Sequence, residues 1–337
     1  MKQYSYITNI SKYTFYDTLV TEISFCYDEE GHTLGLTTSD CGDWGVPSNL
    51  VVHTKKVFPL PVRLKMKWLA LSENKSYEID ESLDQVKAEA LWEKHLQDFP
   101  EDPFTQYFLG IGPYGGVAIW LSSYNRSVLV QWLQAEEQPM IDKDEYEEKY
   151  EDDFPIADVR PFDESVFPPE RLQSNMRQYR YRFVPLEEFF DGKQWRRYTD
   201  NDFFYEQITL NGVEVKRLDG TFDFTDADYL MQYHEAGKPI RITVRWRERR
   251  SSFIAHFWLD EDEITSVFDL FFNTYPEASA DLLLRLDTRA KHFEIALTGK
   301  GLPIHILNNT QYIVAKNDGE FCVSENYNKE FGAWCWR

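Results

Sequence analysis

The chain has 337 residues, of which 36 are Lys or Arg and 57 are Asp or Glu, so its formal net charge is −21. This charge argues against nucleic acid and anionic membrane surfaces as partners, because both are bound through a basic footprint. The 42% hydrophobic content, with 16% aromatic residues, can build hydrophobic cores, and the length suits two domains. No apolar run reaches the roughly 18 residues of a membrane span, and we expect no membrane insertion.

The first 135 residues predict several strands around one helix. Apolar residues alternate with basic ones through 62–68, which is typical of a strand with one buried face. Residues 82–96 have a helical apolar period and acidic residues at their start. The residues expected to share the buried face of this helix are Leu83, Val86, Ala90 and Leu91. Further strands are expected at 19–25, 33–36, 50–57, 107–111, 116–121 and 128–133.

Residues 136–170 interrupt this pattern with a strongly acidic interval. They carry 14 acidic and 3 basic side chains, with five prolines and no clean period. Such a composition is typical of a solvated, self-repelling spacer, and we expect a linker here. The functional alternative is an acidic strip that docks a basic partner.

The second half repeats the order of the first. We predict a strand over 177–184, a hairpin over 208–215 with its turn at Asn211-Gly212, and a short helix from Thr225 that stops by Gly237. A longer helix is predicted over 261–273. Further strands are expected at 239–247, 252–259, 281–287, 291–298 and 303–307.

Two segments show that one unit occurs twice. Residues 61–68 read PVRLKMKW and residues 239–246 read PIRITVRW, and each is followed by an extended segment, an acidic cap and a helix ending at an aromatic residue and Pro. We therefore predict an α+β fold of two tandem, similarly built domains, each a largely antiparallel β-sheet with one main helix. The expected limits are 1–135 for the first domain, 136–170 for the linker and 171–337 for the second, diverged domain.

A glycine motif at 110–116 resembles a nucleotide-binding loop. It contains a literal G-x-G-x-x-G, but a dinucleotide site needs a helix after the glycines to hold the pyrophosphate. The following residues, 117–121, are β-branched, aromatic and extended, and the other kinase motifs do not occur in the chain. We predict a tight β-turn that binds no nucleotide.

Other chemistries have little support in the sequence. The seven histidines are scattered without metal-ligand spacing, and no nucleophile motif for acyl transfer occurs. Carboxylates are too abundant to be informative, although 10 Trp, 20 Tyr and 24 Phe could supply sugar-stacking surfaces. A carbohydrate-binding or carbohydrate-active protein is thus the alternative to a protein binder, and a structural scaffold is the third class. No catalytic residue, cofactor or metal is expected.

A basic patch is predicted on the repeated strand of the second half. Arg241, Arg245 and Arg247 share a strand face, with Arg249 and Arg250 in the turn that follows. The patch could pair with the acidic interval, lie in solvent, or bind a carboxylate or phosphate ligand. The first two explanations are the safer ones.

The four cysteines lie two near each end of the chain and lack zinc-binding spacing. We expect free thiols in a cytoplasmic protein, whereas a periplasmic form, with a leader removed, could pair Cys26 with Cys41 and Cys322 with Cys335.

Three motifs carry a resemblance to a known family. They are Gly42-Asp43-Trp44-Gly45, the run from Leu60-Pro61 to Tyr77 with WLALSENKSY, and LGIGPYGGVAIWL at 109–121. Over about residues 14–135 the chain resembles a family of bacterial proteins of unassigned biochemistry, often small lipoproteins, that are commonly encoded beside type VI secretion effectors. The second copy lacks both glycine motifs.

The resemblance implies an immunity protein, which is a non-catalytic inhibitor that binds and neutralises a secreted antibacterial toxin. The expected partner is that toxin, with no nucleic acid. The residues expected to bind it are Asp142, Asp144, Glu145, Glu147, Glu148, Glu151, Asp152, Asp153 and Trp44.

Overall fold

The structure is a computed structural model of the whole chain. The residues described here are 2–13, 16–27, 33–35, 42–46, 57–150, 159, 161–165, 167–190, 194–196, 208–225, 227–248, 251–287, 293–316 and 321–324. The chain divides into two compact units, Met1–Gln173 and Ser174–Arg337.

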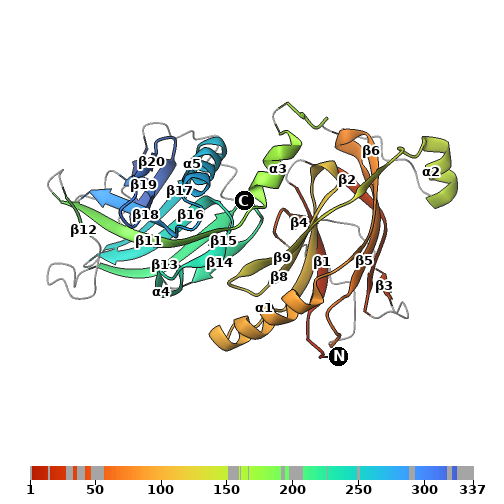
Figure 1. The fold of residues 1–337 in the computed structure, drawn as a ribbon, viewed down its shortest axis with the longest axis horizontal. Helices are drawn as coiled ribbons and strands as arrows, with labels where there is room; N and C mark the ends of the chain where they lie inside the picture. Colours follow the sequence, from red (N-terminus) through yellow and green to blue (C-terminus); the bar gives the residue numbers. More distant parts are fainter. Residues whose placement is uncertain are drawn as a thin grey trace. The chain divides into compact units, whose positions relative to one another are not determined.

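The first unit consists of two five-stranded sheets (Figure 1). The first sheet has the order β4 (Gly42–Asp43), β1 (Ile7–Lys12), β7 (Gln106–Ile111), β8 (Gly116–Ser122), β9 (Ser127–Gln134). The second has the order β10 (Glu136–Gln138), β6 (Lys75–Ser82), β5 (Arg63–Ala70), β2 (Thr18–Cys26), β3 (Thr33–Gly35). β1 runs parallel to β4 and β7, and the other pairs are antiparallel.

The two sheets of this unit share one hydrophobic core. Residues from both sheets form a single buried cluster, and the rings of Phe25 on β2 and Tyr107 on β7 lie 5.7 Å apart across it. Helix α1 (Gln85–Asp98) closes the core with Trp92, whose ring lies 4.9 Å from that of Tyr4. Apolar side chains on alternate positions of each strand are therefore buried between the sheets.

The second unit also consists of two sheets, each with six strands. The first has the order β12 (Gln194–Arg196), β11 (Tyr179–Phe190), β18 (Ala280–Asp287), β19 (Phe293–Gly299), β20 (His305–Leu307), with β15 (His234–Ala236) also on β11. The second has the order β14 (Phe222–Thr225), β13 (Ile208–Arg217), β16 (Pro239–Glu248), β17 (Ser251–Trp258), β21 (Gln311–Lys316), β22 (Phe321–Val323). Among the described strands of this second unit, only β11 and β18 pair in parallel. The helices are α4 (Ala227–Leu230) and α5 (Glu261–Thr274).

The strand orders of the two units match element by element. The series β1-β7-β8-β9 in the first unit corresponds to β11-β18-β19-β20 in the second, and β10-β6-β5-β2-β3 corresponds to β21-β17-β16-β13-β14. The parallel pair β1–β7 of the first unit corresponds to the parallel pair β11–β18 of the second. The predicted α+β fold of two similarly built domains is confirmed.

The repeated strand has the same role in both units. Trp68 on β5 and Trp246 on β16 are buried, and each stacks on the aromatic residue opposite it on the next strand, with Tyr77 at 5.4 Å and Phe253 at 5.0 Å. These rings bury a large apolar area in each core. The repeated sequence therefore encodes a repeated core contact.

The main helices begin alike in the two units. Asp84 caps α1 by accepting a hydrogen bond from the backbone N–H of Lys87 at 2.9 Å, and Asp260 caps α5 by accepting one from Glu263 at 2.8 Å. An Asp side chain at this position satisfies a backbone donor that has no partner within the helix. The acidic cap predicted before each helix is thus the first residue of its capping motif.

Three local predictions for these elements were wrong. Val86 is 81% exposed, because the buried stripe of α1 consists of Ala88, Trp92 and His95. Gly212 belongs to the continuous strand β13, where the register on β16 shifts, so no hairpin turn forms there. The short helix α4 ends at Leu230, before β15, and Gly237 does not terminate it. The strand expected at 50–57 lies almost entirely outside the described residues.

Residues 136–170, predicted as a linker, contain regular structure in the part described. Strand β10 pairs with β6, and helix α2 spans Lys143–Tyr150. Phe162 donates its backbone N–H to the carbonyl of Ser72 at 2.8 Å, and its ring lies 5.7 Å from that of Tyr16. Helix α3 (Pro169–Asn175) spans the boundary between the two units.

Candidate functional site

Glu73 joins two of the sequence motifs in the first unit. It lies in the turn between β5 and β6, and its Oε2 accepts hydrogen bonds from the hydroxyls of Tyr16 at 2.9 Å and Tyr77 at 2.8 Å. Its Oε1 accepts the backbone N–H of Tyr114 at 2.8 Å. Tyr114 has a φ of 56°, a left-handed conformation that needs support from its surroundings. Glu73 therefore holds the turn of the glycine motif against the turn after β5.

The tyrosine hydroxyls around Glu73 remain protonated donors at neutral pH. Burial, reinforced by the nearby Glu73 carboxylate, raises the pKa of Tyr16 and Tyr77 above the ordinary range. Burial, together with Glu164 and Glu73, raises the pKa of Tyr114 to about 12. This arrangement stabilises the turn and keeps each hydroxyl from ionising.

The glycines of the motif make room for tryptophan rings. A Cβ on Gly110 would lie 2.3 Å from Trp120 and 2.9 Å from Trp44, and a Cβ on Gly116 would lie 2.2 Å from Trp132. The Trp44 ring packs edge-on against Trp120, with centroids 4.9 Å apart. The predicted strand after the motif is confirmed as β8, and Pro113–Gly115 form a single turn before it. Absence of nucleotide binding remains a prediction.

The predicted acidic residues are partly brought together by helix α2. Asp142 precedes the helix and accepts the backbone N–H of Glu145 at 2.9 Å, which is a capping interaction. Tyr146 is 4% exposed and anchors the helix to the first unit. The carboxylate residues on or beside α2 are the exposed Asp142, Asp144, Glu145 and Glu148 and the half-buried Glu147. Glu151, Asp152 and Asp153 lie outside the described residues.

Trp44 and helix α2 are associated with different sheets of the first unit. Trp44 is half-buried on β4–β1, where its ring lies 5.3 Å from Tyr13. On α2, Lys149 forms an ion pair with Glu22 on β2 at 3.4 Å. Of the predicted partner-binding residues that the structure describes, Trp44 thus lies on one sheet and the carboxylates of α2 lie beside the other.

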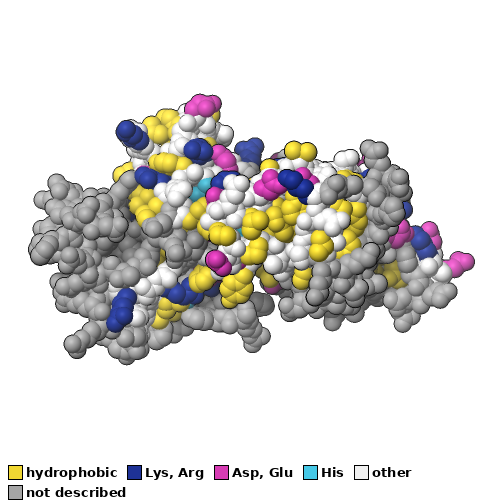
Figure 2. Space-filling model, turned by 90° about the horizontal axis from the view of Figure 1, so that it is seen from below, with side chains coloured by type: hydrophobic (Ala, Val, Ile, Leu, Met, Phe, Trp, Pro, Cys, Tyr) yellow, Lys and Arg dark blue, Asp and Glu magenta, His cyan; other side chains and the backbone are white. Residues whose placement is uncertain are grey.

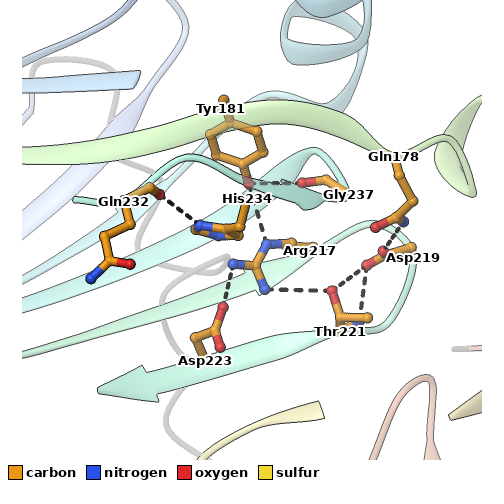
Figure 3. A network of polar contacts seen from close by, with 9 residues as sticks. All are labelled: Gln178, Tyr181, Arg217, Asp219, Thr221, Asp223, Gln232, His234 and Gly237. Carbon is orange, nitrogen blue, oxygen red and sulfur yellow. Dashed lines mark hydrogen bonds and ion pairs between the residues drawn. The ribbon is translucent and has the colours of Figure 1, made fainter. Parts of the chain in front are cut away.

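A buried polar network in the second unit was not predicted from the sequence (Figure 3). Arg217, at the end of β13, donates through Nε to the Tyr181 hydroxyl at 3.2 Å and pairs through Nη2 with Asp223 at 2.5 Å. Burial lowers the pKa of Arg217, but Asp223, Tyr181 and Asp219 together outweigh this effect, so the net shift is upward. The guanidinium stays charged and compensated by its carboxylate partner.

Asp219 forms the second centre of this network. Its Oδ1 accepts the backbone N–H and the hydroxyl of Thr221, at 2.9 and 2.7 Å, and its Oδ2 accepts from the side chain of Gln178 at 2.5 Å (Figure 3). A Cβ on Gly237 would lie 2.4 Å from the Asp219 carboxyl group, so only glycine fits there. The network fixes the turn 217–221 against β11 and the strand that follows Gly237.

The run RLDGTFD at 217–223 was the available sequence signal, because it places three charged residues among apolar ones. Residue spacing alone could not show that the charged side chains face inward. They come together because the β13–β14 turn folds back under β11.

A buried lysine contacts Ser174, the first residue of the second unit. Lys238 has no exposed side-chain surface, and its Nζ donates to the hydroxyl of Ser174 at 2.6 Å and lies 4.0 Å from Asp269. Burial lowers the pKa of Lys238 to about 8. The Asp269 carboxylate also accepts hydrogen bonds from Ser174 and Tyr179. This cluster attaches α3 and β11 to α5.

Within the described ranges, no three His, Cys, Asp or Glu side chains come together as potential ligands of one metal ion. No helix in the same ranges has the length and apolar character of a membrane span. Cys26 is a buried free thiol, and Cys41 and Cys335 lie outside the described residues.

Comparison with known proteins gives one match. The sequence model of DUF2931, described as a protein of unknown function, matches residues 3–178, which is more than half of the chain. The chain belongs to this family. The DUF2931 match ends near the boundary of the first unit and includes Glu73, the glycine motif and helix α2. No curated protein and no solved structure matches the chain.

Proposed function

We propose that this DUF2931 protein is a non-catalytic immunity protein that binds and neutralises a secreted antibacterial toxin. The observation that carries the proposal is the acidic surface of helix α2, which lies inside the family-matched segment. The resemblance of residues 14–135 to proteins encoded beside type VI effectors supplies the kind of partner.

Helix α2 suits electrostatic recognition because its backbone position is fixed while its carboxylates face solvent. Tyr146 is buried against the first unit, whereas Asp144, Glu145 and Glu148 are exposed. A preformed, mainly acidic surface loses less conformational entropy on binding than a disordered acidic segment does. Its field also raises the association rate of a basic partner.

The family motifs support the fold under this surface. Glu73, Gly110 and Gly116 are engaged in contacts with tyrosines and tryptophans of the same unit. Binding energy should therefore come from surface residues around α2, and half-buried aromatic residues such as Trp44 are candidates for anchors at a second place.

The test is protection of a sensitive bacterium. The toxin encoded beside this gene is expressed in that bacterium with the wild-type chain or with a triple variant, Asp144→Lys, Glu145→Lys and Glu148→Lys. We expect survival and a co-purifying complex with the wild type, and loss of both with the variant. The association rate should fall as salt rises, since charges beyond about 8 Å are screened at physiological ionic strength.

The matched control reverses three exposed carboxylates elsewhere on the same unit, at Glu81, Asp98 and Glu101. It has the same net charge as the α2 variant, so it should protect normally if the position of the charge matters. Equal loss of protection in both variants would contradict a role for α2. Survival without a complex would contradict the binding mechanism, because the chain would then act on the product or target of the toxin.

A further inference from the structure

The outward face of β16 and β17 in the second unit differs from the corresponding face in the first. On β16, Arg241, Thr243 and Arg245 point to the side opposite the core residues Ile242 and Val244. Their partners on β17 are Trp258, His256 and Ile254, respectively. Thr243, His256 and Trp258 are buried on this side as well, whereas Arg241 and Arg245 are partly exposed. A mixed basic and aromatic layer therefore covers these two central strands.

On the corresponding face of the first unit, the basic residues are paired with carboxylates. There Arg63, Lys65 and Lys67 occupy the positions of Arg241, Thr243 and Arg245 in the repeated segment. Their side chains pair across to β6, where Arg63 and Lys65 contact Asp80 at 2.5 and 3.8 Å and Lys67 contacts Glu78 at 3.1 Å. Each basic residue of the first unit has a carboxylate within reach.

In the second unit the arginines remain and these carboxylates are absent. His256 stands where the first unit has Asp80, and Ile254 stands where it has Glu78. Among the described residues, neither Arg241 nor Arg245 forms an ion pair. Nε of Arg241 and Nη1 of Arg245 are buried and have no hydrogen-bond partner. Buried donors on charged groups are normally satisfied, so two of them on one face indicate a missing acceptor.

An aromatic ring lies beside each of the two guanidinium groups. The Arg241 guanidinium lies 6.0 Å from the centre of the Trp258 ring, and that of Arg245 lies 5.4 Å from the ring of Phe224 on β14. Stacking on a ring leaves the planar N–H donors free to bind a ligand at their edge. Between the two arginines, the hydroxyl of Thr243 lies 3.0 Å from Nδ1 of His256.

We propose that this face, here called the arginine face (Arg241, Thr243, Arg245, His256 and Trp258), binds an oxyanion, either a carboxylate or a phosphate group. The partly exposed guanidinium groups donate hydrogen bonds to its oxygens. The two arginines lie four residues apart on one strand, with about 13 Å between their Cα atoms, and flank the buried Thr243. The inference does not depend on the proposed toxin binding.

Two charged or titratable neighbours set the affinity of the arginine face. Burial, followed by the charges of Arg241 and Arg245, lowers the pKa of His256 to about 4, so its imidazole is neutral at physiological pH. Glu214 on β13 faces Thr243, and its carboxylate lies 3.9 Å from Nζ of Lys216. Its negative charge opposes an anion, so removing it should strengthen binding.

The test uses side-chain Nε–H signals of arginine in ¹⁵N NMR spectra of the full chain. Sodium phosphate and sodium succinate are titrated separately, with sodium chloride at equal ionic strength as the reference. We expect saturable shifts of the Arg241 and Arg245 signals with at least one of the two probes. Phosphate alone, or succinate alone, then identifies the preferred oxyanion.

Substitutions decide whether the shifts report this face. Arg241→Gln and Arg245→Gln should each weaken binding about tenfold, the effect of one charge-assisted contact, while Glu214→Gln should strengthen it. The matched control is Arg63→Gln, the equivalent position in the first unit, which should leave the affinity unchanged. Circular dichroism checks that each variant is folded. No saturable shift with either probe, or equal weakening by Arg63→Gln, would overturn the proposal.

Discussion

The two units of this protein share their apolar core contacts and differ in their charged networks. The buried Trp68 and Trp246 each stack on a ring of the next strand, and Asp84 and Asp260 cap the corresponding helices. The networks of charged residues differ, since Glu73 organises one in the first unit and Arg217 another in the second. Packing therefore preserves a fold through duplication, while charged groups are free to acquire separate roles.

Figure 2 shows one face of the molecule, on which hydrophobic, basic and acidic side chains are interspersed where the residues are described. The recognition proposed for α2 and for the arginine face depends on the placement of charges.

The largest expected effect is on the shared core contact. Trp68→Ala and Trp246→Ala should each lower the free energy of unfolding by about 3–5 kcal/mol, because each removes a buried aromatic side chain and leaves a cavity. Denaturant unfolding measures the loss, and hydrogen exchange shows where it occurs. Increased exchange should be confined to the unit that carries the substitution. Equal opening of both units by either variant would show that they unfold as one.

A pH dependence should separate the two units next. The pKa of His256 is lowered from 6.5 to about 4, mainly by burial, whereas the first unit has Asp80 at this position. The unfolded chain takes up the proton between these values and the native chain does not, so stability is complete above pH 6.5 and falls toward pH 4. The loss should approach about 3 kcal/mol.

The measurement compares denaturant unfolding of the wild type and His256→Asn from pH 7 to pH 4. The substitution removes this titration and leaves the carboxylates unchanged, so the difference between the two curves isolates His256. Parallel curves would contradict the lowered pKa.

The glycine motif, which only the first unit has, should show a smaller and position-specific effect. Gly110→Ala should destabilise the chain by about 1–3 kcal/mol, because the new Cβ would overlap the Trp120 ring. Gly112→Ala is the control, since its Cβ would meet its nearest neighbours at 3.6 Å, an ordinary contact. Thermal unfolding compares the two. A larger loss at Gly112 would instead favour a backbone role for that residue.

The smallest expected effect is at the helix caps, where the units should behave alike. Asp84→Ala and Asp260→Ala should each cost about 1 kcal/mol, because each leaves a backbone N–H of the first helical turn without its acceptor. Asp84→Asn and Asp260→Asn should recover most of this stability in urea unfolding. Recovery in one unit alone would mean that the acidic charge, rather than the cap, matters in the other.

Short-range sequence patterns are enough to specify several parts of this fold. Alternation in 62–68 and 239–246 specified strands with one buried face, and the acidic caps located both main helices. The repetition of segment 61–68 at 239–246 then predicted two similar domains, because segments with the same apolar pattern bury the same side of their strands. The residues of the glycine motif could also be read as a turn, because the extended segment after it cannot be a helix.

Tertiary structure decided which residues meet. Periodicity predicts that Val86 lies on the buried face of α1. In the structure the larger Trp92 is buried against Tyr4 instead, and Val86 is exposed. Asn211-Gly212 has the sequence of a hairpin turn, yet long pairing with β16 keeps it within one strand. The Arg217 network and the unpaired donors of Arg241 and Arg245 arise from strands distant in sequence, and cross-strand partners are set by register, which no local pattern encodes.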